Sequence, residues 1–257
     1  DIAQGVDIGG AGDQGIMYGY ATDETPEFLQ KGVVLVHALT RGLERLRKEG
    51  VVPWLGPDGK AQVTMEGSRI RTILVSAQHS SAVFHAEVEK TLTDKLIRPL
   101  VGDLTGISVY VNPTGAFTVG GFAADTGLTG RKLMVDTYGG LLPHGGGAFS
   151  GKDPTKVDRS AAYMARFAAK NLVANHYAKR SLVSVAYAIG KAEPLMVHAI
   201  DEEGGDLGEI VRKNFDFRPA AIIERLRLRE PRYQRTAAYG HFGRSEFPWE
   251  EIVAFRK

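Results

Sequence analysis

The sequence contains no cysteine, no long hydrophobic run and no marked excess of charge of one sign. Without cysteine the chain cannot form disulfides, thiolate metal sites or a cysteine nucleophile, and we expect a cytoplasmic location. No apolar run approaches the ~20 residues of a membrane span, and no signal peptide is visible, so we expect no membrane association. The formal net charge is +2, which gives no general electrostatic reason to expect nucleic-acid binding.

The remaining composition is that of an ordinary globular protein, with 43% hydrophobic and 24% charged residues. Its 257 residues suffice for one large domain or two to three small ones. Apolar periodicity predicts helices at 26–50, 81–98, from 153 onward, 207–215 and 219–229. It predicts strands at 16–20, 61–66, 69–78, 107–111, 133–138, 181–189 and 195–201. Strands and helices follow as β-β-α-β units without strict alternation, which favours α+β layers over a doubly wound sheet.

The segment with the most chemical character is residues 144–160, His-Gly-Gly-Gly-Ala-Phe-Ser-Gly-Lys-Asp-Pro-Thr-Lys-Val-Asp-Arg-Ser. Its glycines allow the backbone to approach a ligand closely and to adopt positive φ. Asp153 followed by Pro154 predicts a helix start, with Asp153 as N-cap and Pro154 at the first helical position. The apolar stripe of this helix is expected to comprise Val157, Ala161, Met164, Ala168 and Leu172.

Charged side chains surround this helix start. Lys152, Lys156 and Arg159 provide three cations near the free amides of the first turn, an arrangement typical of a polyanion site. Asp158 adds a carboxylate, as a magnesium-bound phosphate would require. The tract therefore predicts a site for a nucleotide triphosphate, although glycine-rich turns before an Asp-Pro helix start also occur in proteins that bind nothing there.

The same residues nearly match the phosphate-loop pattern G-x-x-x-x-G-K-[ST]. Gly146 to Lys152 fits its first seven positions, but the eighth is Asp153, which would place a negative charge where a hydroxyl should hold magnesium. Pro154 also starts the helix after the lysine, whereas a phosphate loop has its lysine inside the helix. We therefore reject the phosphate-loop NTPase interpretation but still predict that this tract binds phosphate.

Isolated charged residues elsewhere allow two interpretations. Asp13 lies between glycines and fits a plain turn residue as well as a ligand contact. Arg131 and Lys132 follow a glycine-rich stretch, where they could be solvated surface or could grip phosphate. Lys60, next to a hairpin, fits a solvated turn lysine better on spacing alone. His79, at the end of that hairpin, fits a structural group better than a ligand.

Five segments together resemble the S-adenosylmethionine synthetase (methionine adenosyltransferase) family of the bacterial and eukaryotic type. They are residues 10–15, 127–132, 135–140, 144–160 and 237–243. The resemblance implies three α+β domains related by a pseudo-threefold axis, with active sites shared between the subunits of a homodimer or homotetramer. It implies an enzyme of one-carbon metabolism that joins ATP and L-methionine to give S-adenosylmethionine, hydrolyses the tripolyphosphate to pyrophosphate and phosphate, and uses Mg²⁺ and K⁺.

The resemblance also implies roles for individual residues. The catalytic residues would be Lys60, Arg131, Lys132, Lys152 and Lys156. The ATP contacts would be Asp58, Lys60, Phe117, Asp125, Arg131, Lys132, Ala148 and Lys152, with the ring of Phe117 stacked on adenine. The methionine contacts would be Asp13, Asp125 and Lys156, and the metal ligand would be Asp158.

The chain departs from the family pattern at three places. Ala116 stands where an arginine usually precedes the aromatic residue, residues 122–124 replace a proline- and glycine-containing turn before Asp125, and the approach to Asp13 is shorter than the usual lid. These departures leave open two rival hypotheses. One is a non-catalytic partner that regulates an active subunit, and the other is a different phosphotransferase with the same polyphosphate site.

The order of motifs predicts a domain division. Residues 1–15 would form a lid loop and the start of a motif, 16–115 an α+β domain, and 116–257 discontinuous α+β domains that carry the polyphosphate site. The match begins partway into the family pattern, and no His-Pro-Asp segment is present. We therefore expect the first part of the fold to be missing here, and to be present in the working protein or supplied by a second chain. Activity of the 257 residues alone stays open.

Overall fold

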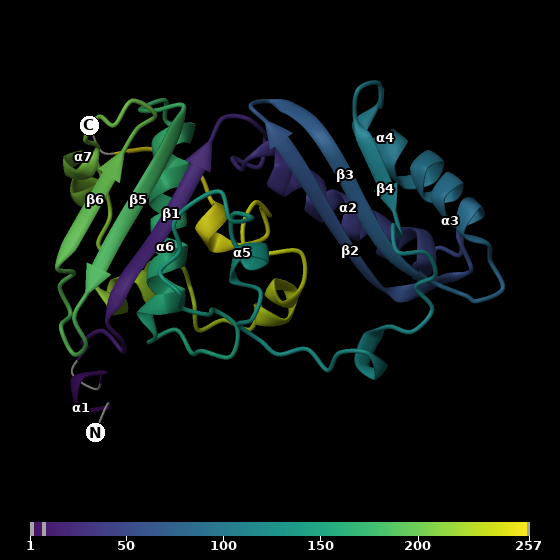
Figure 1. Ribbon diagram of the computed structural model, residues 1–257. Coiled ribbons are helices and arrows are strands. Elements are labelled where there is room, and N and C mark those ends of the chain that lie inside the picture. Colours follow the sequence, from purple (N-terminus) through teal and green to yellow (C-terminus); the bar gives the residue numbers. More distant parts are fainter. Residues whose placement is uncertain (1–2, 7–8, 256–257) are drawn as a thin grey trace. The chain divides into compact units, whose positions relative to one another are not determined.

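The computed structural model describes residues 3–6 and 9–255. The chain forms two compact units, the first made of Asp1–Gln30 and Thr129–Lys257, the second of Lys31–Leu128. Both combine helices with a three-stranded sheet (Figure 1), which confirms the α+β class.

The first unit is built on an antiparallel sheet of order β1-β5-β6, from β1 (Gly15–Thr22), β5 (Arg180–Tyr187) and β6 (Met196–Ile200). The helix α6 (Val157–Ala174) runs along this sheet (Figure 1). A side chain at Gly19 of β1 would lie 1.9 Å from the carbonyl carbon of Ala165. Glycine at this position therefore lets strand and helix pack backbone to backbone.

The helix α6 is buried on all sides, so the predicted apolar stripe accounts for only part of its buried residues. The five predicted stripe residues are buried, as expected. Arg166 and Lys170, on the other faces, are buried as well and bind Glu250 at the end of the short helix η4 (Pro248–Glu250). A helix without a solvated face can carry polar residues only where each is paired.

Short helices complete the first unit: α1 (Ala3–Val6), α5 (Leu133–Asp136), α7 (Gly208–Asn214), α8 (Pro219–Arg225) and η3 (Tyr233–Ala237). The prediction of a strand at 133–138 was wrong, because this segment contains α5. Its amide and hydroxyl groups bond locally, with the Asp136 N–H donating to the Lys132 carbonyl and the Thr137 hydroxyl to the Leu133 carbonyl. Short apolar runs do not distinguish strand from helix by period alone.

The second unit contains a sheet of order β2-β3-β4, from β2 (Leu55–Glu66), β3 (Arg69–His79) and β4 (Ser108–Val111). β2 and β3 form the predicted antiparallel hairpin, and β4 pairs parallel to β3. The parallel connection runs through α3 (His85–Leu92), a π-helical turn η1 (Thr93–Ile97) and α4 (Arg98–Val101). This order is the predicted β-β-α-β unit.

The helix α2 (Lys31–Lys48) packs on the sheet of the second unit through buried leucines, among them Leu39, Leu43 and Leu46. It begins five residues later than the predicted start at 26. Residues 26–30 belong to the first unit. There the carbonyls of Glu27 and Phe28 accept hydrogen bonds from the Arg166 guanidinium, so they are not available for the hydrogen bonds of a helix. A further short helix, η2 (Gly121–Ala123), lies near the end of the second unit.

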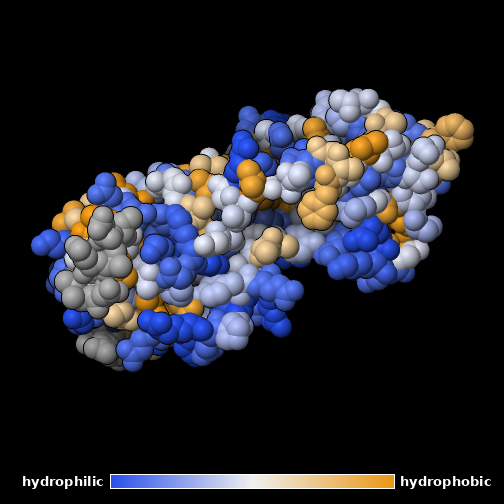
Figure 2. Space-filling model, turned by 90° about the horizontal axis from the view of Figure 1, so that it is seen from below, coloured by the Kyte–Doolittle hydropathy of each residue, from blue (hydrophilic) through white to orange (hydrophobic). Residues whose placement is uncertain are grey.

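In the described part of the chain, no helix is long and apolar enough to cross a membrane. On the face drawn in Figure 2, hydrophobic residues stand in small groups among hydrophilic ones. The most exposed large hydrophobic residues are Phe122 (89%) and Phe84 (83%), both in the second unit.

Candidate functional site

The start of α6 differs from the prediction in one respect. The helix begins at Val157, with Lys156 as its N-cap residue, so the prediction that Asp153 caps it was wrong. Asp153 Oδ1 instead accepts hydrogen bonds from the amide and the hydroxyl of Thr155. A separate turn follows Pro154, closed by the Lys156 amide, which donates to the Asp153 carbonyl at 3.2 Å, and α6 begins only after this turn.

Lys152 and Asp158 form an ion pair against the glycine loop. The side chain of Lys152 is 30% exposed and that of Asp158 is 14% exposed. A side chain at Gly147 would lie 2.3 Å from the Asp158 carboxylate, so only glycine fits at this position. The loop backbone, the ammonium group and the carboxylate therefore converge at one point of the first unit.

Lys156 lies beside the motif that contains Asp13. A side chain at Gly12 would lie 2.8 Å from the carbonyl oxygen of Thr155 and 3.2 Å from Cδ of Lys156. The half-buried Asp13 follows immediately, and its Oδ1 accepts a hydrogen bond of 2.8 Å from the Gln14 amide. Two of the residues that the resemblance assigns to methionine thus come from segments that pack together.

The segment before Arg131 also packs on the glycine loop. A side chain at Gly130, whose φ is +75°, would lie 2.6 Å from Cβ of Ala148. The Thr129 hydroxyl donates to the Ser150 carbonyl at 3.4 Å. Arg131 and Lys132 are exposed, and neither forms an ion pair with another described residue. Both cations are therefore available for an external anion.

His144 fastens the beginning of the glycine loop. Its Nδ1 accepts a hydrogen bond of 2.8 Å from the Gly146 amide, which leaves Nε2 as the protonated nitrogen of the neutral ring. Burial lowers the pKa of His144, and the nearby Asp158 carboxylate opposes that shift in part. The neutral form is also the one that keeps this hydrogen bond.

Arg159 does not have the open position that its spacing indicates. Its side chain is buried (4% exposed), and its guanidinium donates to the carbonyl of Lys152 at 2.9 Å and to the hydroxyl of Tyr163 at 3.1 Å. The expectation that it forms part of an open cluster of three cations was wrong. Arg159 supports the loop from beneath, a role that no local pattern in the sequence indicates.

In the second unit, Asp58 and Phe117 are brought together by the ends of the hairpin. Asp58 Oδ2 accepts a hydrogen bond of 2.9 Å from the Gly121 amide. Phe117 is bound to His79 twice: its carbonyl accepts from the His79 amide at 2.9 Å, and its amide donates to Nε2 of His79 at 3.1 Å. The interpretation of His79 as a structural group is confirmed.

Gln78 is a neighbouring residue whose role the sequence did not indicate. Its side chain accepts from the Asp58 amide at 3.3 Å and donates to the Thr118 carbonyl at 3.2 Å. It thus links the loop that contains Asp58 to the segment that follows Phe117. Alternation along β3 predicts the direction of this side chain, but only the tertiary structure shows what it reaches.

The remaining candidates of the second unit are exposed. Lys60 lies within β2, opposite Ser76, and forms no ion pair with a described residue. Asp125 accepts a hydrogen bond of 2.9 Å from the Gly127 amide through its Oδ1 and shapes a turn. Its second carboxylate oxygen remains available to a ligand.

A magnesium ion would find only part of its ligands in the protein. Among the described residues, no group of three or more His, Asp or Glu side chains is arranged to hold a metal. Mg²⁺ commonly binds one or two carboxylates together with substrate phosphates and water. The Asp158 carboxylate beside Lys152 fits that pattern, since phosphate oxygens would complete the coordination.

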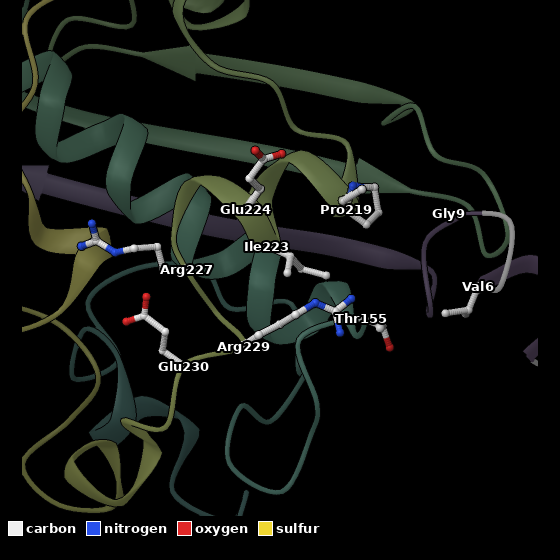
Figure 3. Close-up of a pocket in the computed structure, with 11 residues that line it drawn as sticks. Val6, Gly9, Thr155, Pro219, Ile223, Glu224, Arg227, Arg229 and Glu230 are labelled. Atoms are coloured by element: carbon white, nitrogen blue, oxygen red, sulfur yellow. The ribbon is translucent and has the colours of Figure 1, made fainter.

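A separate cavity of about 470 Å³ is lined in part by Thr155. Its apolar lining includes Val6, Pro219, Ala220 and Ile223. Figure 3 shows Ile223 and Arg229 extending toward Thr155, whereas Glu224 points away. None of the predicted site residues lines this cavity, so it is separate from the Lys152–Asp158 pair.

Comparisons with known proteins agree with the motifs. Residues 8–117 match the model of the S-adenosylmethionine synthetase central domain, and residues 119–251 match that of its C-terminal domain. The chain is 55% identical to the S-adenosylmethionine synthase of Pseudothermotoga lettingae, over 95% of this chain and 66% of the relative. It is 54% identical to the S-adenosylmethionine synthase of Kosmotoga olearia, over 96% of this chain and 67% of the relative.

The S-adenosylmethionine synthase of Thermus thermophilus is 54% identical, over 94% of this chain and 65% of the relative. The chain thus spans about two thirds of the length of the curated relatives it matches. With both family models matched in sequence order and identities above half, the chain belongs to the S-adenosylmethionine synthetase family.

Proposed function

We propose that this protein takes part in the synthesis of S-adenosylmethionine from ATP and L-methionine, with hydrolysis of the tripolyphosphate to pyrophosphate and phosphate. Family membership and the names of the relatives support the first reaction. The observation that carries the proposal is the Lys152–Asp158 pair held against Gly147, because it places a cation and a carboxylate beside a loop without side chains. Such a loop suits a bound polyphosphate.

We propose the following roles in the first unit. Lys152, Arg131 and Lys132 bind the tripolyphosphate, supported by the contact of the Gly130 and Ala148 segments. Asp158 holds magnesium, and Ala148 contributes backbone near the nucleotide. Lys156 and Asp13, which lie on neighbouring segments, bind methionine.

In the second unit, we propose that Asp58, Lys60 and Phe117 contact ATP and that Asp125 contacts both substrates. The hydrogen bonds of the Asp58 amide to Gln78 and of the Phe117 amide to His79 support a common role, because they hold both residues at the end of β3. Lys60 and Asp125 have exposed functional groups that can reach a ligand. K⁺ would act as an activating ion.

The chemistry requires positioning and charge stabilisation more than acid–base catalysis. The methionine sulfur attacks the ribose 5′ carbon of ATP, a sulfonium forms, and the tripolyphosphate leaves with the electron pair of the broken C–O bond. Lys152, Arg131 and Lys132 stabilise the charge that develops on the leaving group. Magnesium, when bound, neutralises phosphate charge as a Lewis acid. Lys156 and Asp13 hold methionine in line for the attack.

Product analysis tests the proposal. The protein is incubated with ATP, methionine, Mg²⁺ and K⁺, and S-adenosylmethionine, pyrophosphate and phosphate are quantified by mass spectrometry and ion chromatography. We expect all three products. Nucleotide binding without product would favour the non-catalytic partner, and a phosphorylated acceptor would favour a different phosphotransferase.

A substitution gives this test a residue-level readout. Lys152→Ala should lower the rate of product formation on the order of 10²-fold, because one donor to the leaving group is lost. Its melting temperature should stay close to that of the wild type, since a part-exposed ion pair contributes only ~0–1 kcal/mol. Lys179→Ala, an exposed lysine of the same unit, is the matched control and should leave the rate unchanged. A large loss of stability in Lys152→Ala with full tripolyphosphate binding would refute the role.

A further inference from the structure

Arg159 lies beneath the glycine loop and contacts it from the first turn of α6. The guanidinium nitrogens divide among three acceptors: Nη1 donates to the Lys152 carbonyl at 2.9 Å, Nε to the Tyr163 hydroxyl at 3.1 Å and Nη2 to the Thr236 hydroxyl at 3.4 Å. The guanidinium carbon also lies 4.0 Å from the ring centroid of Tyr233. A planar fork with this many partners fixes the side chain in one orientation.

The partners of Arg159 are themselves rigidly held. Because Tyr163 accepts from Arg159, its own hydroxyl proton is free to donate to Nδ1 of His241 at 2.7 Å. Burial, together with the nearby Arg159 and Arg244, lowers the pKa of His241 to about 3, so its ring stays neutral and can accept. The Tyr163 ring stacks on Trp249 with centroids 3.9 Å apart.

The loop is anchored in the core at Phe149, whose buried ring lies 5.4 Å from that of Tyr163 and 5.1 Å from that of His241, but Lys152 follows three residues later. Gly151, at φ +88°, adds no side-chain contact of its own to this turn. The Lys152 amide donates to the Phe149 carbonyl at 3.2 Å, a long bond within the same loop. The Arg159 bond therefore ties the Lys152 main chain to the buried core, which no bond within the loop can do.

We propose that Arg159 is a positioning residue that holds the main chain of Lys152 so that its ammonium group meets the polyphosphate. The identity of the anion rests on the proposed function. The claim that Arg159 holds the loop in place concerns the loop alone. Arg159 does not touch the ligand. It acts through Lys152, and Tyr163 and His241 act through Arg159.

Amide hydrogen exchange tests, without any ligand, whether Arg159 holds the loop. Arg159→Lys keeps the positive charge but cannot reach three acceptors at once. We expect exchange of the amides in residues 147–155 to become at least about tenfold faster, because local opening becomes easier. Arg212→Lys is the matched control, since Arg212 also donates to a main-chain carbonyl, that of Val197, on another part of the same unit. Unchanged exchange in 147–155 would overturn the proposal.

A double-mutant cycle tests the link to Lys152. Tripolyphosphate with Mg²⁺ is titrated into the wild type, Arg159→Lys, Lys152→Ala and the double variant by calorimetry. We expect Arg159→Lys to weaken binding about tenfold in the wild-type background and by less than about twofold in the Lys152→Ala background, because coupled residues are not additive. A purely structural role would weaken both backgrounds equally, and that result would contradict the proposal.

The two measurements separate the two proposals. Absence of tripolyphosphate binding in the wild type would contradict the proposed function, while the exchange result would still decide whether Arg159 holds the loop. Melting temperatures of the wild type and the three variants of the cycle identify any variant that fails to fold. If Arg159→Lys fails to fold, Tyr163→Phe replaces it in both experiments. This variant keeps the ring stack on Trp249 and removes only the hydroxyl that Arg159 binds.

Discussion

At Glu250, a carboxylate without solvent exposure binds two cations of α6. Its Oε2 lies 2.8 Å from Nη2 of Arg166 and 2.9 Å from Nζ of Lys170, and its Oε1 accepts from the Gly243 amide at 2.8 Å. The guanidinium of Arg166 also donates to the carbonyls of Tyr20, Glu27 and Phe28. One buried group of ions thereby joins η4, α6 and β1.

The pKa of Glu250 makes this group sensitive to acid. Burial alone would raise the pKa, but the Arg166 guanidinium, with Lys170, reverses this and holds the pKa below its usual value of 4.5. The folded state therefore binds a proton less readily than the unfolded state does. The contribution of Glu250 to stability is present in full above about pH 4.5 and is lost as the pH falls through the folded pKa.

We predict that Glu250→Gln destabilises the first unit by about 3–5 kcal/mol at neutral pH, because it leaves two buried cations without their counterion. The variant should also lose part of the acid sensitivity of the wild type. Urea denaturation at neutral and acid pH measures both effects. Glu251→Gln is the control: its partner Arg227 is half-exposed, so the loss should stay within ~1 kcal/mol. Equal losses in the two variants would refute the buried role of Glu250.

At the scale of elements, β4 is extended by a side chain. Asn112 follows Val111, the last residue of β4, and its amide group pairs with the main chain of Ala77 on β3. Oδ1 accepts from the Ala77 amide at 2.7 Å, and Nδ2 donates to the Ala77 carbonyl at 2.9 Å. The side chain is 2% exposed, and the backbone of Asn112 is left-handed, with φ +44°. The chain can thus turn away while both groups of β3 stay paired.

We predict that Asn112→Ala destabilises the second unit by roughly 2–6 kcal/mol, since two buried main-chain groups lose their partners at ~1–3 kcal/mol each. The midpoint of thermal or urea unfolding measures the loss. Ser108→Ala, an exposed residue at the other end of β4, serves as the control and should change stability by less than ~0.5 kcal/mol. A loss of stability in Asn112→Ala no larger than that in Ser108→Ala would contradict the prediction. It would mean that water replaces the amide group fully.

At the scale of the whole molecule, we propose that the protein is a homodimer, or a homotetramer formed by two dimers, with the active site at the interface. Residues 115–128 support this, because Val119, Phe122 and Leu128 expose 66%, 89% and 71% of their surface. Exposed hydrophobic side chains on a glycine-rich segment are typical of surfaces that another protein covers.

Sedimentation measures the assembly. We predict a dimer that buries more than ~2,000 Å², as obligate interfaces do. Phe122→Ser should shift the equilibrium toward monomer, whereas Phe84→Ser, equally exposed but outside this segment, should not. A stable, folded monomer at micromolar concentration would contradict the proposal. Three predictions stay untested. They are the domain division into 1–15, 16–115 and 116–257, the pseudo-threefold arrangement of the domains, and the cytoplasmic location.

Much of the fold could be predicted from local pattern. The 2-residue period of the hairpin and the apolar periodicity of α2 and α6 identified these elements because burial on one face is visible in sequence. The prediction failed at 133–138, where a short apolar run forms α5, and at Asp153, whose carboxylate binds Thr155 and does not cap α6. Both failures depend on competition between nearby hydrogen bonds, which residue type alone does not decide.

The sequence by itself determined the family, the glycine loop and the positions of Lys152 and Asp158, because these depend on residue order within short segments. Only the tertiary structure decided that Arg159 is buried beneath Lys152, that His79 binds Phe117 and that Glu250 balances Arg166. Each of these contacts joins an ionisable or polar side chain to a group on another segment of the fold. A charged residue looks the same in sequence whether it faces solvent or a buried partner, and only the packing of distant segments decides which environment it has.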